Sequence, residues 1–189
     1  INYSINMILN LKIFLDILMF SRGPQDLPSS SNLLKAIILI NIIIGLISVG
    51  PNTGYASSIF FAAISILVTL IFIKLCLGIK DNNNGTPNLY ASRYTQVSSG
   101  TLGVHALSEL FVKIVIIYIF TGEIIDENLL VNSVLVFTVM GISLYTLFVN
   151  GHIFKNALDT TMSIGIGIAL LNNIILFIIM IILAQVPLI

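Results

Sequence analysis

Charged side chains are scarce in this sequence. Only 8% of its 189 residues are Asp, Glu, Lys or Arg, whereas soluble domains carry about 25% charged residues. Hydrophobic residues make up 57% of the chain, and this balance excludes an ordinary soluble domain and predicts an integral membrane protein. Eight basic and eight acidic side chains cancel. The chain therefore has no net field that would attract nucleic acid, and we expect no nucleic-acid partner.

Cysteine and the motifs of catalytic sites are also lacking. Cys76 is the single cysteine, so an internal disulfide is excluded and a small apolar packing role is expected. The sequence contains no Gly-rich phosphate loop with a lysine, no nucleophile elbow and no His-Glu zinc signature. Two widely separated histidines, His105 and His152, supply too few ligands for a metal ion. We therefore expect no catalysis, no cofactor and no metal site.

Long apolar runs, by contrast, are abundant. A helix needs about 20 mostly apolar residues to cross the hydrocarbon core of a bilayer. Stretches close to this length predict five transmembrane helices, over residues 33–49, 56–77, 97–121, 129–149 and 160–184. The predicted fold class is an all-α membrane protein, a five-transmembrane-helix bundle over residues 33–189. The Asn-rich stretch 78–96 is expected to be a solvated loop.

Residues 1–32 are predicted to precede the bundle as an interfacial helix and a Pro-containing linker. The stretch 5–20, "INMILNLKIFLDILMF", is apolar but carries Lys12 and Asp16 four residues apart on one helix face. It predicts an amphipathic helix that lies on the cytoplasmic membrane surface. A targeting sequence is the competing interpretation, because hydrophobic regions of signal peptides have a similar length.

The positions of the basic residues predict the orientation of the chain. Cytoplasmic flanks of membrane spans are enriched in Lys and Arg. In a four-span alternative, with the charged third segment on the surface, Lys155 would lie on the side opposite Lys74 and Lys80. The five-span arrangement is favoured, with a cytoplasmic amino terminus and a carboxyl terminus outside. It places seven of the eight basic residues on one side: Lys12, Arg22, Lys35, Lys74, Lys80, Arg93 and Lys155.

The third predicted span carries three ionisable side chains at four-residue intervals, His105, Glu109 and Lys113, here called the polar seam. Glu109 and Lys113 can neutralise each other as an i, i+4 pair. An isolated charge near the bilayer centre costs about 3 kcal/mol or more, so the seam is expected to face other helices and not lipid. A proton or ion relay is one interpretation. A buried polar network that fixes helix packing is favoured, because Glu109 has a cation beside it.

A second set of candidate residues lies on the predicted cytoplasmic side. Arg22 precedes the first span, and His152, Lys155 and Asp159 are expected in the loop between the fourth and fifth spans. Such loop side chains commonly contact lipid headgroups while they remain solvated. We therefore list these four residues as candidate cytoplasmic loop contacts.

Three segments carry a family resemblance. They are "RGPQDLPSSSNLL" at 22–34, "YTQVSSGTLGVHALSEL" at 94–110 and "GHIFKNALD" at 151–159. They resemble recurring segments of a family of uncharacterised proteobacterial inner-membrane proteins, in which a GPQDLP-like turn precedes the first span and GHI-x-x-x-AL precedes the last. The arrangement is also distantly similar to the Yip-domain membrane proteins. The resemblance implies a bacterial inner (plasma) membrane location with a periplasmic carboxyl terminus, and the polar seam is not part of its pattern.

The sequence as a whole predicts a non-catalytic inner-membrane protein that acts as a scaffold or accessory subunit of a larger membrane complex. Its expected partners are the lipid bilayer and other integral membrane proteins, because short outer loops and little soluble mass leave mainly helix surfaces for contact. The alternative is a small transporter or an ion- or proton-conducting protein that uses the polar seam. A membrane enzyme is a third and less favoured class.

Overall fold

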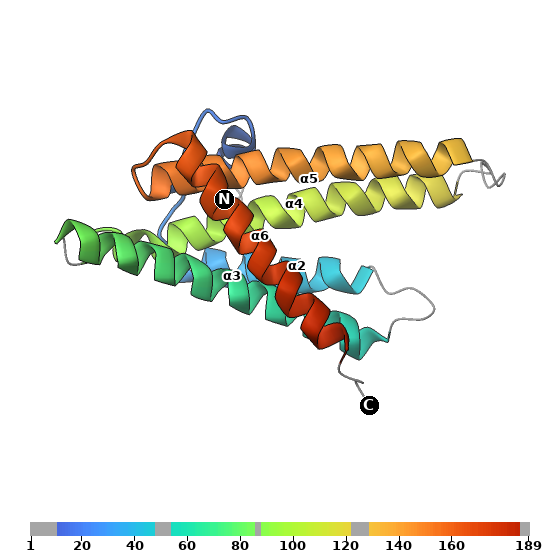
Figure 1. Cartoon of the computed structure of the whole chain (residues 1–189), viewed down its shortest axis with the longest axis horizontal. Coiled ribbons are helices and arrows are strands. Elements are labelled where there is room, and N and C mark those ends of the chain that lie inside the picture. Colours follow the sequence, from blue (N-terminus) through green and yellow to red (C-terminus); the bar gives the residue numbers. More distant parts are fainter. Residues whose placement is uncertain (1–10, 48–53, 86–87, 122–128, 186–189) are drawn as a thin grey trace, which may run out of the picture.

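The computed structural model describes residues 11–47, 54–85, 88–121 and 129–185, and the regular structure in these ranges is helical. Two short 3-10 turns, η1 (Pro24–Asp26) and η2 (Ala91–Arg93), accompany the long helices. The long helices form an elongated bundle (Figure 1). Within the described ranges the predicted all-α class is confirmed. The long helices are α2 (Ser31–Ile47), α3 (Tyr55–Asn84), α4 (Tyr94–Thr121), α5 (Leu129–Ala157) and α6 (Met162–Ala184).

Three of these helices are long and apolar enough to cross a membrane. They cover Ser57–Asn84, Val136–Ala157 and Met162–Leu183. α2 is apolar as well but has 17 residues. Length and composition therefore support a membrane protein with three candidate spans among the described residues.

The helices extend further at one end of the bundle than their apolar runs predict. α3 continues to Asn84, where Gly85 ends it in the left-handed conformation with φ 63°. The prediction of a loop over 78–96 is therefore wrong at both ends, because α4 also begins earlier than expected, at Tyr94. The Asp81 side chain explains the extension, because it accepts hydrogen bonds from the backbone N–H groups of Tyr90 and Ala91 at 2.8 and 2.9 Å. Polar residues that the hydropathy pattern assigns to a loop thus hold the end of α3 against η2.

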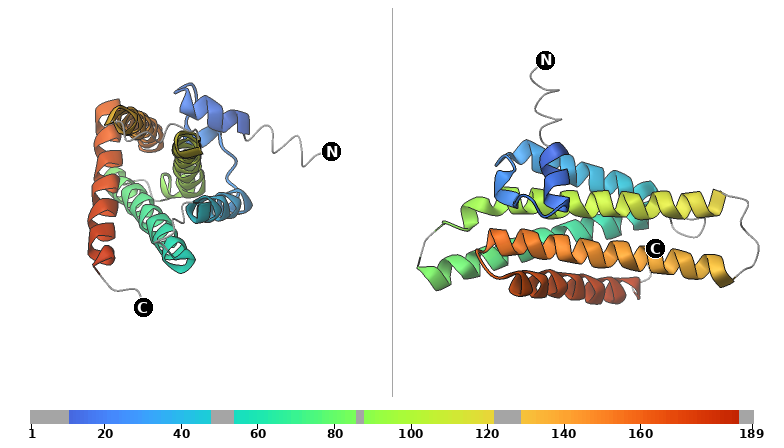
Figure 2. Two further views of the ribbon diagram at one scale, coloured as in Figure 1. Left: turned by 90° about the vertical axis from the view of Figure 1, so that its right-hand side faces the viewer. Right: turned by 90° about the horizontal axis from the view of Figure 1, so that it is seen from above.

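α4 is the central helix and contacts α2, α3 and α5, while α5 packs against α6. Seen along the bundle, α4 and α5 point toward the viewer, whereas α6 runs across them (Figure 2). The crossing of α5 and α6 requires close backbone approach. A Cβ atom added to Gly165 of α6 would collide with the backbone carbonyl of Gly151 on α5, and a side chain at this position would force the helices apart.

The amino-terminal segment packs into the bundle. Residues 11–18 are helical, and the side chains of Phe14 and Ile17 are buried. The Phe14 ring lies directly over Gly103 of α4, where any Cβ would clash with it. Asp16 pairs with Arg22 at 3.3 Å, in place of the expected partner four residues earlier. Residues 5–10 of the predicted interfacial helix lie outside the described residues, and its position on the membrane surface stays a prediction.

Candidate functional site

The structure brings the three residues of the polar seam together on one face of α4. Lys113 Nζ lies 2.9 Å from Glu109 Oε1, and His105 Nδ1 lies 3.8 Å from Glu109 Oε2. The Lys113 side chain is 9% exposed and also donates a hydrogen bond to the backbone carbonyl of Ile44 on α2. Lys113 is therefore held by two acceptors in the protein interior. Such pairing lowers the cost of placing a cation there.

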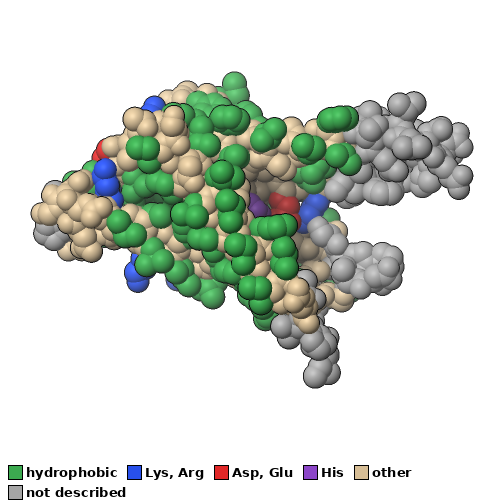
Figure 3. Space-filling model, viewed as in Figure 1, with side chains coloured by type: hydrophobic (Ala, Val, Ile, Leu, Met, Phe, Trp, Pro, Cys, Tyr) green, Lys and Arg blue, Asp and Glu red, His purple; other side chains and the backbone are tan. Residues whose placement is uncertain are grey.

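The other two members of the seam border an open cavity. This cavity has a volume of about 410 Å³ and lies between α2, α3, α4 and α6. The His105 side chain is 50% exposed and that of Glu109 33%. Figure 3 shows acidic, basic and histidine side chains in a hollow bordered by hydrophobic side chains. His105 and Glu109 thus face an open space between helices, whereas Lys113 packs against α2.

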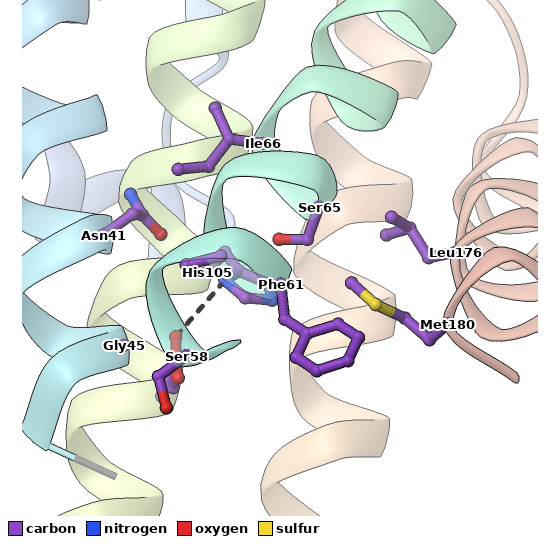
Figure 4. A pocket seen from close by; sticks show the side chains of 11 residues that line it. Asn41, Gly45, Ser58, Phe61, Ser65, Ile66, His105, Leu176 and Met180 are labelled. Atoms are coloured by element: carbon purple, nitrogen blue, oxygen red, sulfur yellow. Dashed lines mark ion pairs between the residues drawn. The ribbon is translucent and has the colours of Figure 1, made fainter. Parts of the chain in front are cut away.

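Small residues opposite α4 account for the open space. Gly45 on α2, with Ser58, Ala62 and Ser65 on α3, lines the cavity. These small side chains leave space that the larger residues of the same lining, Phe61, Leu176 and Met180, do not close. Figure 4 shows His105 surrounded by side chains from several helices, among them Phe61 of α3 and Met180 of α6.

A second, smaller pocket of about 20 Å³, here called the inner pocket, adjoins the cavity and is lined mostly by polar residues. Five residues line both spaces, among them Asn41, Ser65 and His105. Asn41 is fixed in place, because its side-chain nitrogen donates to the carbonyls of Ile37 at 2.8 Å and Leu102 at 3.1 Å. The remaining polar residues of the inner pocket come from α3, α4, α5 and α6: Thr69, Thr101, Asn150, Asn172 and Asn173.

Three polar atoms of the inner pocket lack partners. Thr101 Oγ1, Asn150 Oδ1 and Asn172 Oδ1 are buried, and the described part of the chain offers no hydrogen bond to any of them. Leaving a buried polar atom unpaired costs about 1–3 kcal/mol. Buried polar groups in native proteins are almost always paired with protein or with ordered water. The inner pocket therefore presents three buried hydrogen-bonding atoms that the described residues leave unpaired.

His152 occupies a different environment from the predicted one. It lies within α5 and not in a loop, because residues 149–154 are buried against neighbouring helices and α5 continues through them. His152 Nε2 is 2.9 Å from the backbone carbonyl oxygen of Arg22. The imidazole ring also meets the Phe20 ring edge-on, with centroids 5.4 Å apart. His152 therefore joins the amino-terminal segment to α5, and the expected contact with lipid headgroups is not supported.

The other candidate loop contacts separate into different places. Asp159 pairs with Arg93 Nη1 at 3.1 Å, and Arg93 also donates to the backbone carbonyl of Ala157 at 3.2 Å. Lys155 lies half-buried in α5, and the Arg22 side chain binds Asp16. Sequence spacing could not reveal the pair of Arg93 with Asp159, since 66 residues separate them, and the six-residue separation of Asp16 and Arg22 is not the spacing of neighbours on a helix. Of the four residues, the structure brings together His152 and the backbone of Arg22, while Asp159 pairs elsewhere with Arg93.

Neither a metal-binding cluster among the described residues nor a similar known protein identifies this site. Among the described residues, no group of three or more His, Cys, Asp or Glu side chains could hold a metal ion. No protein-family model, no curated protein and no solved structure matches the chain. The resemblance to proteobacterial inner-membrane proteins therefore stays a prediction.

Proposed function

We propose that this protein crosses the bilayer and moves a small polar solute or ion through the cavity beside α4. The observation that carries the proposal is the exposure of His105 and Glu109 to that cavity. Ionisable side chains within membrane spans face either other helices or a water-filled space. A seam that served packing alone would be covered by neighbouring helices. This exposure favours the transporter alternative over the scaffold.

The membrane arrangement in this proposal has five spans. α4 has 28 residues, and at 1.5 Å per residue it is about 42 Å long, more than the roughly 30 Å of a hydrocarbon core. α2 has 17 residues, the lower end of the range for a span. The charges support the same arrangement, since the visible Lys and Arg side chains gather mainly at one end of the molecule (Figure 3). The amino terminus would then be cytoplasmic and the carboxyl terminus outside.

Water access to the cavity is the first test. In a Cys76→Ser background, a cysteine is introduced at Ser65, which lines both the outer cavity and the inner pocket. Its reaction with a small charged thiol reagent in membrane vesicles measures access, because the reactive thiolate forms in water and not in lipid. Ser65→Cys is expected to react. Matched controls are Leu67→Cys, which is exposed on the outside of α3, and Val104→Cys, which is fully buried.

Solute movement is the second test. The purified protein is placed in liposomes, and small ions are tested one at a time with a membrane-potential dye and an internal pH dye. His105→Gln removes the titratable ring from the cavity and is expected to lower the rate by roughly a hundredfold, the size of a typical acid-base contribution. Lys155→Gln changes an ionisable residue outside the cavity and serves as the control. If Ser65→Cys reacts no faster than the two control cysteines and no ion moves, the transporter proposal is wrong.

A further inference from the structure

We propose that the inner pocket is a binding site for one alkali-metal cation, Na⁺ or K⁺, which is held by neutral oxygen atoms. This inference rests on the proposed function, because it names the class of ion that the outer cavity admits. The observation behind it is the convergence of side-chain oxygens from five helices on a space of about 20 Å³. Two of the amide oxygens and one hydroxyl are buried, and the described residues give them no partner.

The oxygen-bearing side chains of the inner pocket are fixed by helix packing. Each of the five long helices contributes at least one of them. A ligand set on packed helices is held more precisely than one on loops. The five most enclosed members are each 8% exposed or less: Asn41 on α2, Thr69 on α3, Thr101 on α4, Asn150 on α5 and Asn172 on α6.

The orientation of Asn41 shows which end of its amide is available to a ligand. Its side-chain nitrogen donates to the backbone carbonyls of Ile37 at 2.8 Å and Leu102 at 3.1 Å. An amide nitrogen has two N–H groups and a carbonyl oxygen only accepts, so the reversed amide would set its oxygen against two other oxygens. In Figure 4 the Asn41 oxygen lies on the side of His105. Asn41 therefore offers an acceptor to the pocket.

A single water molecule does not satisfy this set of acceptors. Asn41 Oδ1, Asn150 Oδ1 and Asn172 Oδ1 only accept hydrogen bonds, whereas a water molecule has two hydrogens to donate. The volume of about 20 Å³ leaves room for about one water, which needs about 10–15 Å³. A cation, by contrast, attracts every oxygen that surrounds it, as in channel filters lined by carbonyl oxygens. The third amide oxygen therefore favours a cation over a water molecule.

The chemistry of these ligands selects an ion with a single positive charge. Ca²⁺ and Mg²⁺ are bound through carboxylates, and no Asp or Glu of the described residues lines the inner pocket. Transition metals prefer imidazole and thiolate ligands, of which the described lining has only His105. Neutral carbonyl oxygens can replace the hydration shell of K⁺. The amide and hydroxyl oxygens of the pocket are neutral in the same way.

The outer cavity gives a cation access to this site. It adjoins the inner pocket, and the oxygen-bearing residues Asn41 and Ser65 line both spaces. Lys113 would repel an entering cation if its charge were free. Its ammonium group lies 2.9 Å from Glu109 Oε1 and also donates to the carbonyl of Ile44. This pairing reduces the repulsion, and Lys113 lines neither space.

Thermal unfolding of the whole purified protein in detergent tests the site. The melting temperature is followed by helical circular dichroism at pH 8 in increasing NaCl, KCl or choline chloride. Choline is too large for the pocket and serves as the inert cation, because screening of surface charges is the same in all three salts. At ten times its dissociation constant, the bound cation is expected to raise the melting temperature by about 4 °C. The rise should saturate with concentration.

Asn172→Leu removes one oxygen and keeps the approximate size of the side chain. In choline chloride this variant should be at least as stable as the parent, because it loses a buried atom that has no partner. In NaCl or KCl the half-saturating concentration should rise about tenfold, as for the loss of one bond to a charged group. Thr101→Val tests the same site if Asn172→Leu does not purify as a folded protein.

Thr146→Val is the matched control. It removes a hydroxyl that lies 2.8 Å from Ser108 Oγ and that belongs to neither space. Its half-saturating concentration should equal that of the parent. Saturable stabilisation by Na⁺ or K⁺ that weakens in Asn172→Leu and persists in Thr146→Val supports the site. Equal melting temperatures of the parent in the three chlorides, or a rise that neither Asn172→Leu nor Thr101→Val weakens, would overturn it.

The liposome measurement separates this inference from the proposed function. If ions move across the liposome membrane but no cation stabilises the parent, the cation site is wrong while the transporter proposal stands. If Na⁺ or K⁺ stabilises the parent through Asn172 but no ion moves, the site stands and the transporter proposal is wrong.

Discussion

The buried ion pair of the seam predicts unequal effects from removing its two members. Lys113 is 9% exposed, whereas Glu109 is 33% exposed and borders the cavity. Glu109→Gln leaves a buried ammonium group without its counter-charge, and breaking such a pair costs about 3 kcal/mol. Lys113→Met leaves a carboxylate that cavity water can solvate, so the loss should be nearer about 1 kcal/mol. Glu109→Gln is therefore expected to be the more destabilising substitution.

The double substitution measures how strongly the two residues depend on each other. Glu109→Gln combined with Lys113→Met removes both charges, so no ion is stranded, and it should recover about 2 kcal/mol relative to the sum of the single losses. Unfolding of the three variants and the parent in detergent, followed by helical circular dichroism, gives the four free energies. A coupling energy near zero would show that the pair is not buried. If Lys113→Met lost more stability than Glu109→Gln, the Glu109 carboxylate would be the member of the pair that is shielded from water, and the open cavity beside it would be wrong.

Three further results are expected. Gly165→Ala should destabilise the protein by about 1–3 kcal/mol because its Cβ meets the backbone of α5, whereas Gly167→Ala, with nothing within 4 Å of the added atom, should unfold no more easily than the parent. His152→Leu should lower the free energy of unfolding by about 1 kcal/mol, because the Arg22 carbonyl and the Asn156 side chain lose their contacts with the ring; an unchanged melting temperature would exclude these contacts. Reporter fusions should place Asn83 in the cytoplasm and Ile189, which lies outside the described residues, on the other side; a cytoplasmic Ile189 would refute five spans.

The predicted scaffold function can be tested directly by co-purification. If the chain serves a larger assembly, it should migrate with other membrane proteins after gentle extraction, because its exposed helix faces would pack against them. Mass spectrometry of the co-migrating proteins identifies such partners. A monodisperse protein that moves ions after reconstitution would contradict the scaffold function and favour the transporter.

Features that depend on local sequence could be predicted. Hydropathy located the long helices, because any apolar run of this length must form its backbone hydrogen bonds internally in lipid. The contact of Glu109 with Lys113 followed from their four-residue spacing, since such side chains are neighbours on any helix. Both inferences depend only on the geometry of a single helix. The all-helical class and the position of the seam were therefore accessible from the sequence alone.

Features that depend on which residues face each other across different segments could be seen only in the tertiary structure. Arg22 binds Asp16 through the turn after the first helical segment, and His152 meets a backbone carbonyl 130 residues away. From the hydropathy pattern, the fourth span was expected to end before His152, whereas packing against neighbouring helices allows α5 to continue to Ala157. The cavity beside His105 exists because small residues of α2 and α3 face α4 there. A helix pattern specifies which residues share a face, whereas only the packing of several helices decides whether that face meets side chains, lipid or open space.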